Sequence, residues 1–470
     1  MPKDSVQPQP ESRNNLQTAE AYDHLLPQVM FYLIIAFIPF FRWRTLPVLD
    51  LKIDWVLTAL LLMILAPYLI LQKQIPRRLS GNAWVPLLLF LLANFVAYLL
   101  SPFPEQAMSG LTGLLMGALF MIISALMVSD RGFEKIMPLA LALSMGLAAG
   151  LAVLGYFGNL QLFINEENEA LGASSGANNM ALMCLFVLPL MVYWAVHGSS
   201  SSMRTAGIFL SALLVLGVIS TVSRGGFLNL TVVLALLLFQ YRKYFKIKSL
   251  GLIVAIAGMG LLAAAAVIPK EFFERQASIV TVGSGNQDQS LDRRASYVKV
   301  AIDATRERPV IGWGTDVFKK VWVRSEETRW FKMQERPAHN TYLEVIVGSG
   351  FIGLFLFLLM MWKTFSNFHS AERRLMSNGF QAQAHLCGAY KLGLLSVMFY
   401  FFFKSGLDHK YFLLIIPLSM AAVRFAENVL ASNKVSPEKA TPTTFPSSLS
   451  RNPALDTYIP RRHARRNSNT

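Results

Sequence analysis

The feature that most constrains this chain is a series of apolar runs, each about 17 to 25 residues long and nearly free of charge. A run of this length crosses the hydrocarbon core of a bilayer as a helix, because its backbone amides must find hydrogen-bond partners within the segment. Such runs occupy residues 25–41, 54–72, 84–100, 108–128, 136–157, 178–196, 205–222, 226–240, 249–268, 340–363, 388–403 and 411–426. The sequence therefore predicts an all-α integral membrane protein with about 12 transmembrane helices.

Composition agrees with this class, since 54% of the 470 residues are hydrophobic and mean hydropathy is +0.43. Continuous runs argue against an outer-membrane barrel, whose strands alternate apolar and polar residues. The first run, 25–41, is short for a span, so a tilted, re-entrant or interfacial helix stays open. Two cysteines, both in or beside apolar runs, support neither a disulfide framework nor a thiolate metal site.

The net charge of +15 lies mostly in short loops and a basic tail, with no nucleic-acid-binding pattern, so no nucleic-acid partner is predicted. The basic short loops and the tail fall on one side of the membrane. The loops on the other side include SPFPEQA and NLQLFINEENEALGASSGANN, which contain no Lys or Arg. The positive-inside rule then places both termini in the cytoplasm. Three residues break the rule if the first run spans: Arg42, Arg44 and Lys52.

Five regions follow from this topology. Residues 1–24 are a disordered cytoplasmic N-terminus, and 25–268 contain transmembrane helices 1–9. A loop domain on the outer face covers 269–338, helices 10–12 occupy 339–426, and 427–470 form a disordered basic cytoplasmic tail. The loop is too long to be a plain connection, and its helical periodicity predicts that it is folded.

Within the loop, DRRASYVKVAIDATRERPVIGWGTDVF predicts a helix that begins with Asp292 as its N-cap and stops before Pro309. One face of this helix carries Arg294, Val298, Ala301 and Thr305. Residues 310–314 then form a compact turn, which includes Trp313. Thr315 is placed to cap a second short helix, whose packing residues are Val317, Phe318, Val321 and Trp322.

Arg224 lies in ISTVSRGGFLNL, between two apolar runs with almost no loop between them. A guanidinium at the edge of a span is either an interfacial anchor or a ligand for an anion. The pair Gly225–Gly226 leaves room for close approach, and an adjacent helix N-terminus favours anionic oxygens. Arg224 is therefore a candidate for anion binding as well as for anchoring.

His339 directly precedes an apolar run, with Asn340, Tyr342 and Glu344 as polar neighbours. Only His339 and His409 reach the outer face in this topology. A histidine in this place is either an interfacial hydrogen-bonder or a general base, because its ordinary pKa is about 6.5. The glycines that follow it are expected to allow close helix packing: Gly348, Gly350 and Gly353.

Metalloprotease, Walker and nucleophile-elbow motifs are missing, and the acidic run at 166–169 reads as a solvated loop. No metal site is predicted. Arginines beside a possible base on the outer face suit an anionic, lipid-linked substrate such as a lipid pyrophosphate, since guanidinium binds phosphate oxygens in bidentate fashion.

The motifs resemble those of the O-antigen ligase and O-antigen polymerase superfamily of bacterial inner membranes. HNTYLEVIVGSGFIG is similar to its pattern of His-Asn, nine residues and Gly-x-x-Gly. Arg294, fifteen residues before the Pro of RPVIGWG, and SRGG at Arg224 are similar to its two arginine positions. The resemblance covers about residues 205–365 with motifs, and elsewhere rests on span count and loop placement.

This resemblance implies a C-type glycosyltransferase that needs no cofactor or metal and inverts the anomeric centre. Its donor would be an undecaprenyl-pyrophosphate-linked glycan, and its active site would face the periplasm. Arg224 and Arg294 would hold the pyrophosphate, and His339 would orient or deprotonate the acceptor hydroxyl. Further substrate-binding candidates are Arg293, Asn340, Asn179 and Trp313.

The leading hypothesis is an O-antigen ligase that acts on lipid A–core, with a polymerase of O-antigen or exopolysaccharide as the alternative. The partners are then the lipid-linked glycan, lipid A–core or a growing glycan, and membrane lipids. A protein O-glycosyltransferase is a third variant. A secondary transporter is disfavoured, because transporters usually carry ionisable groups near the bilayer midplane and show repeated halves.

Overall fold

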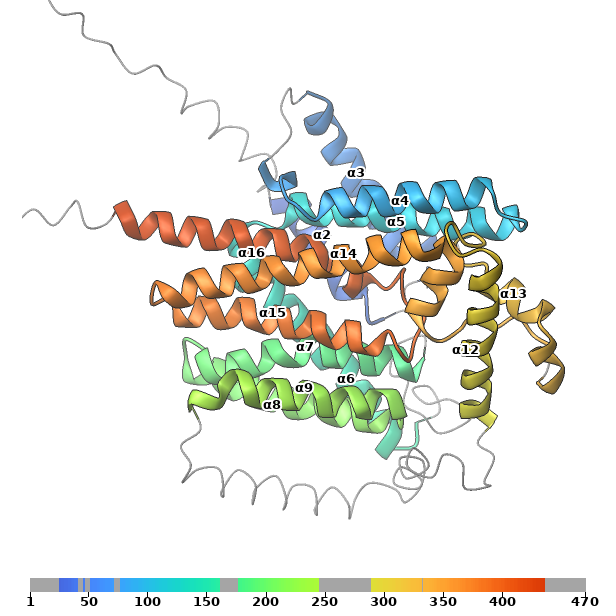
Figure 1. Ribbon diagram of the computed structural model, residues 1–470. Coiled ribbons are helices and arrows are strands. Elements are labelled where there is room, and N and C mark those ends of the chain that lie inside the picture. Colours follow the sequence, from blue (N-terminus) through green and yellow to red (C-terminus); the bar gives the residue numbers. More distant parts are fainter. Residues whose placement is uncertain are drawn as a thin grey trace, which may run out of the picture. The chain divides into compact units, whose positions relative to one another are not determined.

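The computed structural model describes residues 25–40, 45–46, 51–71, 77–160, 176–244, 289–331 and 333–435. Outside these ranges lie the predicted N-terminal segment, most of the acidic loop, the run at 249–268 and most of the basic tail. Apart from β1 (Thr45–Leu46) and β2 (Leu51–Lys52), which pair antiparallel, the regular structure of the described residues is helical. The prediction of an all-α protein is confirmed (Figure 1).

Up to residue 244, the described residues form eight longer helices and three short helical turns. The helices are α2 (Leu25–Phe37), α3 (Ile53–Leu71), α4 (Trp84–Leu99), α5 (Pro104–Met127), α6 (Met137–Phe157), α7 (Ala177–His197), α8 (Ser201–Ser220) and α9 (Arg224–Tyr241). The turns are η3 (Arg77–Leu79), η4 (Gly132–Ile136) and η5 (Arg242–Tyr244).

From residue 289 onward, the described residues comprise the polar segment and three long helices. The polar segment forms α12 (Gln289–Glu307), α13 (Phe318–Arg324) and η6 (Glu326–Trp330). The long helices are α14 (Thr341–Ser377), α15 (Gln381–Tyr400) and α16 (Lys410–Val435).

Seven helices among the described residues are long and apolar enough to cross a membrane. They are Pro104–Met127, Gly132–Phe157, Ala177–His197, Ser201–Ser220, Arg224–Tyr244, Thr341–Ser377 and Lys410–Asn433. Three predicted spans correspond to shorter apolar helices, Leu25–Phe37, Val56–Ala66 and Trp84–Leu99. The predicted run 388–403 falls in α15, which packs among α7, α9 and α14. The count of about 12 spans stays a prediction.

Helix α7 forms the centre of the bundle. Fifteen of its 21 residues are buried, including every residue from 180 to 191, and it packs against α8, α9 and α15. Helix α8 is equally apolar by sequence but leaves Ile208 and Phe209 more than 60% exposed. Because the hydrocarbon of a bilayer solvates such side chains, these outward apolar faces fit a protein that spans a membrane.

Two helices continue past the predicted ends of their spans. Helix α16 runs to Val435, although residues from 427 onward were expected to be a disordered tail. Polar contacts of its last turns explain the difference: Glu427 pairs with Arg77 at 3.6 Å, and Asn428 Nδ2 donates to Asp130 Oδ2 at 2.6 Å. Helix α14 likewise extends to Ser377, beyond the expected end at 363.

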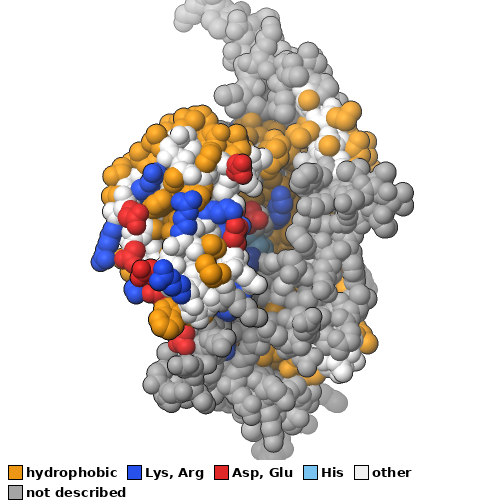
Figure 2. Space-filling model, turned by 90° about the vertical axis from the view of Figure 1, so that its right-hand side faces the viewer, with side chains coloured by type: hydrophobic (Ala, Val, Ile, Leu, Met, Phe, Trp, Pro, Cys, Tyr) orange, Lys and Arg blue, Asp and Glu red, His pale blue; other side chains and the backbone are white. Residues whose placement is uncertain are grey.

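One end of the bundle carries the polar segment, and we call it the loop end. The first residues of α7, α9 and α14 meet the last residues of α15 there, and α12 packs against α14 (Figure 1). Figure 2 looks onto this end, where basic and acidic side chains are interspersed over the described surface. The loop end is therefore a polar face of a bundle whose long helices are mostly apolar.

Candidate functional site

The polar segment folds around a small apolar core of its own. Its buried members are Tyr297, Val300, Ala301, Ala304, Phe318, Trp322, Ala338 and Val347. The predicted helix is present, but it begins at Gln289, so Asp292 lies in its first turn instead of at its N-cap. On the face predicted to carry Arg294, Val298, Ala301 and Thr305, Ala301 and Thr305 are buried, whereas Val298 is 42% exposed. Tyr297 is buried as well, and its ring packs edge-on against Trp322, with centroids 4.6 Å apart.

The second helix of the segment also forms, without the predicted cap. Phe318 and Trp322 are buried, as the pattern predicted. Helix α13 begins at Phe318, and its N-cap residue makes no side-chain hydrogen bond. Thr315 Oγ1 instead donates to Asn94 Oδ1 of α4 at 2.7 Å. This contact joins the polar segment to the bundle, so Thr315 holds the two parts together.

Residues 309–314 are hydrogen-bonded to a break in α14. Trp313 N donates to Val347 O at 2.8 Å, and Phe351 N donates to Pro309 O at 2.7 Å. The break lies at Gly350, where φ is +65°, and a Cβ there would lie 2.3 Å from Val310 O. The glycine of the Gly-x-x-Gly pattern therefore admits the backbone of the loop, whereas close packing of helices was expected.

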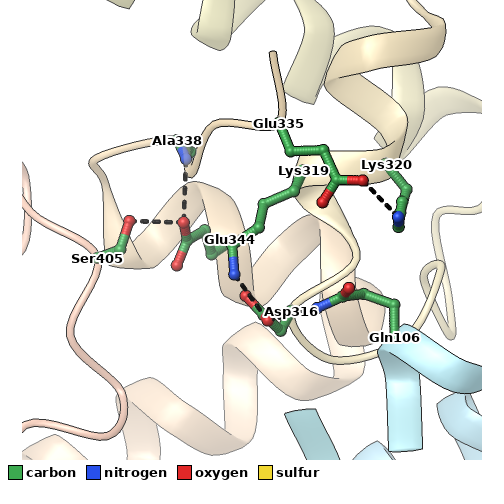
Figure 3. A network of polar contacts seen from close by, with 8 residues as sticks. All are labelled: Gln106, Asp316, Lys319, Lys320, Glu335, Ala338, Glu344 and Ser405. Carbon is green, nitrogen blue, oxygen red and sulfur yellow. Dashed lines mark hydrogen bonds and ion pairs between the residues drawn. The ribbon is translucent and has the colours of Figure 1, made fainter. Parts of the chain in front are cut away.

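His339 lies in a tightly held turn just before α14. Its φ is +50°, which is uncommon for a residue other than glycine. On its C-terminal side, Asn340 caps α14 by accepting a hydrogen bond from Leu343 N at 3.1 Å. On its N-terminal side, Glu344 Oε1 accepts from Ala338 N at 3.0 Å (Figure 3). These contacts fix the backbone on both sides of the imidazole.

Arg224 is the first residue of α9, and its position follows from a capping serine. Ser223 Oγ accepts from Gly226 N at 3.0 Å and donates to Asn178 Oδ1 of α7 at 2.7 Å. Tyr400 OH, at the end of α15, donates to the same Asn178 oxygen at 3.3 Å. Three helix ends are thereby tied together beside Arg224, where the positive end of the α9 dipole favours an anion.

The pair Gly225–Gly226 allows this junction to close. A Cβ at Gly225 would lie 2.9 Å from Phe403 Cβ, and one at Gly226 would lie 2.8 Å from Ala181 Cβ. The sequence predicted that other groups approach these glycines closely. The groups that do so are Phe403, from the loop after α15, and Ala181 of α7.

Arg294 lies within electrostatic range of Arg224 at the loop end. Burial lowers the pKa of the Arg294 guanidinium, and the charges of Arg224 and Arg293 lower it further, while Tyr400 and Tyr297 act in the opposite sense. The two arginines are thus close enough to repel each other, although 70 residues of sequence separate them (294 minus 224). Two such cations in a partly buried place are favoured by an anion that binds between them.

His339 belongs to the same cluster. Burial lowers the pKa of its imidazole to about 4, and the charges of Arg294, Arg293, Arg336 and Lys404 contribute in that order. The His339 imidazole is therefore neutral at pH 7 and can accept a proton. The structure brings together Arg224, Arg293, Arg294 and His339, from α9, α12 and the turn before α14.

The other predicted binding residues have different surroundings. The Asn340 side-chain oxygen caps α14. Trp313 Nε1 donates to Ala304 O at 2.8 Å, and the Trp313 ring lies against Phe103 and the Arg308 guanidinium. Asn179 adjoins the junction, but it is its neighbour Asn178 that hydrogen-bonds with Ser223. The contacts of Asn340 and Trp313 are thus structural, and their binding roles stay predictions.

Among the residues near the cluster that the sequence analysis missed are Tyr400 and Lys404. Both lie in FYFFFKSGLDHK, where the aromatic run reads as the end of a span. The signal that was available is a single basic residue at the edge of an apolar run, which is the same signal that drew attention to Arg224. Within the described residues, no group of three or more His, Cys, Asp or Glu side chains lies close enough together to hold a metal ion.

The fold and the site together define a helical membrane protein with arginines and a neutral histidine gathered at its polar end. Residues 209–358, which contain Arg224, Arg294 and His339, match the family described as O-antigen ligase. The match confirms, over this region, the resemblance to the O-antigen ligase and polymerase superfamily that the motifs indicated. The chain is thus a bacterial membrane protein.

A comparison with curated proteins adds one relative, an uncharacterized protein of Haemophilus influenzae. The two chains are 27% identical over 195 residues, which are 40% of this chain and 48% of the relative. The chain thus spans about half the length of the curated relative it matches.

Proposed function

We propose that this protein is a glycosyltransferase that moves a glycan from undecaprenyl pyrophosphate to lipid A–core, as an O-antigen ligase. The observation that carries the proposal is the convergence of Arg224, Arg294 and His339, from three distant segments, at one end of the bundle. The family match over residues 209–358 supports a lipid-linked glycan as the class of substrate.

In this proposal the arginines act on the leaving group. Arg224, with the N-terminus of α9, and Arg294 bind the pyrophosphate oxygens and offset the charge that develops as the bond to the sugar breaks. Their mutual repulsion favours binding of the dianionic pyrophosphate. Arg293, beside Arg294, adds to the same field.

His339 acts on the acceptor. Its neutral imidazole takes the proton of the acceptor hydroxyl as the oxygen forms a bond to the anomeric carbon and the bond from that carbon to the pyrophosphate oxygen breaks. Attack from the face opposite the leaving group inverts the anomeric centre. The bound pyrophosphate offsets the neighbouring cations, so the His339 pKa rises in the complex and the imidazole becomes a better base.

The alternative within the same superfamily is a polymerase, which joins lipid-linked repeat units. Ligase and polymerase use the same donor, so pyrophosphate-binding residues do not separate them. We favour the ligase because the sequence from His339 to Gly353 follows the ligase-type spacing.

Topology completes the proposal. With about 12 spans and both termini in the cytoplasm, the loop end faces the periplasm. The absence of Lys and Arg from SPFPEQA supports this orientation, since the α4–α5 turn lies at the loop end, where Ser101 Oγ donates to Trp313 O at 2.5 Å.

A deletion strain tests whether the protein acts as a ligase or as a polymerase. Its surface glycans are separated on a gel. Loss of a ligase leaves full-length polymer on undecaprenyl pyrophosphate and a bare lipid A–core. A single repeat unit on core, or missing exopolysaccharide with unchanged lipopolysaccharide, would identify a polymerase and contradict the ligase assignment. Unchanged glycans of both kinds would contradict the proposal as a whole.

A further inference from the structure

The loop after α15, residues 401–409, is fastened to the start of α14. Thr341 N donates to Phe401 O at 2.8 Å, and Thr341 Oγ1 donates to Lys404 O at 2.6 Å. Thr341 is the first residue of α14 and lies two positions after His339. The backbone of the loop is therefore fixed relative to the first turn of α14.

The same stretch of chain also lies against the start of α9, where Arg224 is. A Cβ at Gly225 would be 2.9 Å from Phe403 Cβ, so Phe403 packs on the backbone directly after Arg224. On the other side of Arg224, the hydroxyls of Ser223 and Tyr400 share a hydrogen bond of 3.3 Å. Contacts on both flanks of Arg224 therefore come from residues 400–403.

One carboxylate joins this loop to the turn that contains His339. Glu344 Oε1 accepts a hydrogen bond from Ser405 Oγ at 2.5 Å and another from Ala338 N at 3.0 Å, as Figure 3 shows. Within the described part of the chain, no other hydrogen bond ties residues 337–339 to the rest of the fold. A backbone φ of +50° at His339 is costly and persists only where the surroundings hold it. The orientation of His339 therefore depends on Glu344.

We propose that Glu344 is a positioning residue, which holds the His339 imidazole at a fixed place relative to Arg224 through the loop after α15. This inference rests on the proposed function, in which His339 serves the acceptor and Arg224 the donor pyrophosphate. Proton removal and departure of the pyrophosphate belong to one step, so a displacement of about 1 Å between base and donor costs about 10²-fold in rate. Glu344 acts through its acceptor oxygen, because both of its side-chain hydrogen bonds go to Oε1.

Steady-state kinetics with purified protein tests the role of this oxygen. For Glu344→Ala, kcat should fall about tenfold to a hundredfold with the donor KM unchanged, because the base is displaced while the arginines stay in place. Glu344→Gln keeps an acceptor oxygen and should restore most of kcat. Glu335→Gln, at an exposed carboxylate of the same polar segment that pairs with Lys320, is the matched control and should behave as wild type. Equal losses for Ala and Gln at position 344, or a rise in the donor KM, would overturn the proposal.

The link through the loop has its own test in Ser405. Ser405→Ala removes the hydrogen bond from the loop to Glu344 and leaves the one from Ala338, so kcat should fall by about tenfold or less. Adding Ser405→Ala to Glu344→Ala should cause no further loss, because both changes remove the same contact. Additive losses, or wild-type kinetics for Ser405→Ala, would refute the link between His339 and the loop.

Chemical modification of His339 tests the inference without any turnover. Diethyl pyrocarbonate acylates neutral imidazole, and His339 is neutral at pH 7 because its pKa is about 4. Release of the turn in Glu344→Ala should raise the rate of modification at His339 several-fold, measured by mass spectrometry of its peptide, whereas Glu344→Gln and Glu335→Gln should match wild type. An unchanged rate in Glu344→Ala would refute the inference even if the wild-type protein transfers no glycan. A raised rate in a protein that transfers no glycan would contradict the proposed function while supporting the hold of Glu344 on His339.

Discussion

The proposed base should stay active at a pH where an ordinary histidine is protonated. Burial, followed by the charges of Arg294, Arg293, Arg336 and Lys404, lowers the pKa of His339 to about 4. At pH 5.5, an imidazole with a pKa of about 6.5 is only about 10% neutral, whereas one with a pKa of about 4 is about 97% neutral. Because kcat/KM reports the free enzyme, it should fall by less than about 10% between pH 7.5 and 5.5, instead of about tenfold.

Two substitutions separate the local charges from burial as causes of this shift. Arg336→Gln removes a cation that acts on His339, so the pKa of the imidazole should rise and the acid limb of kcat/KM should move to higher pH. Arg306→Gln is the matched control, because Arg306 pairs with Asp303 at 3.3 Å and is not among the groups that act on His339. Its profile should coincide with that of wild type.

The assay is transfer from a lipid-linked donor at limiting concentration, over the range of pH 4.5 to 8 set by these two pKa values of about 4 and 6.5. If kcat/KM of the wild-type protein falls on the acid side with a pKa of about 6.5, the argument that the cluster lowers the His339 pKa is refuted. Equal profiles for Arg336→Gln and Arg306→Gln would refute the electrostatic part of it.

Three further outcomes are expected. Alanine at Arg224, Arg294 or His339 should reduce glycan transfer by about 10²- to 10³-fold or more without loss of folded protein. Lysine should not restore activity at either arginine position, and normal turnover of the alanine variants would mean that these residues are only anchors. Gly350→Ala should lower the thermal unfolding midpoint, because its φ is +65° and a Cβ would meet Val310 O, whereas Gly113→Ala, with nothing within 4 Å of its Cβ, should not. In the topology test, an impermeant thiol reagent should label Ser284→Cys but not Ser447→Cys from outside, with little background because both native cysteines are buried; the reverse pattern would overturn the orientation.

Much of the secondary structure could be predicted from local sequence. Apolar runs of spanning length become helices wherever the chain is described, because backbone amides in hydrocarbon have no other partners. The polar segment was recognisable as folded from its periodicity. The periodicity did not show that Tyr297 is buried, because its place depends on the ring of Trp322, which comes from another helix.

The candidate site was predicted in part. Arg224, Arg294 and His339 stood out because charged or ionisable side chains at the edges of spans are costly without a partner or a role. Lys404 gave the same signal but was hidden by the aromatic run before it, which reads as a continuing span, whereas α15 ends at Tyr400. The Gly-x-x-Gly pattern was visible in the sequence. The sequence did not show that the backbone of residues 309–314 packs against Gly350.

The sequence by itself determined the class of protein, the helices and the residue types available for chemistry, because these depend on local hydropathy and on the cost of placing charge near lipid. Only the tertiary structure decided which of these residues meet. Helices α7 and α8 are both apolar, yet α7 is mostly buried inside the bundle and α8 exposes Ile208 and Phe209 on the outside. Local hydropathy does not distinguish the two, because hydrocarbon and protein interior accept the same side chains. The junction of Ser223, Asn178 and Tyr400 and the fastening of Lys404 beside His339 depend on contacts between distant segments, which no local pattern specifies.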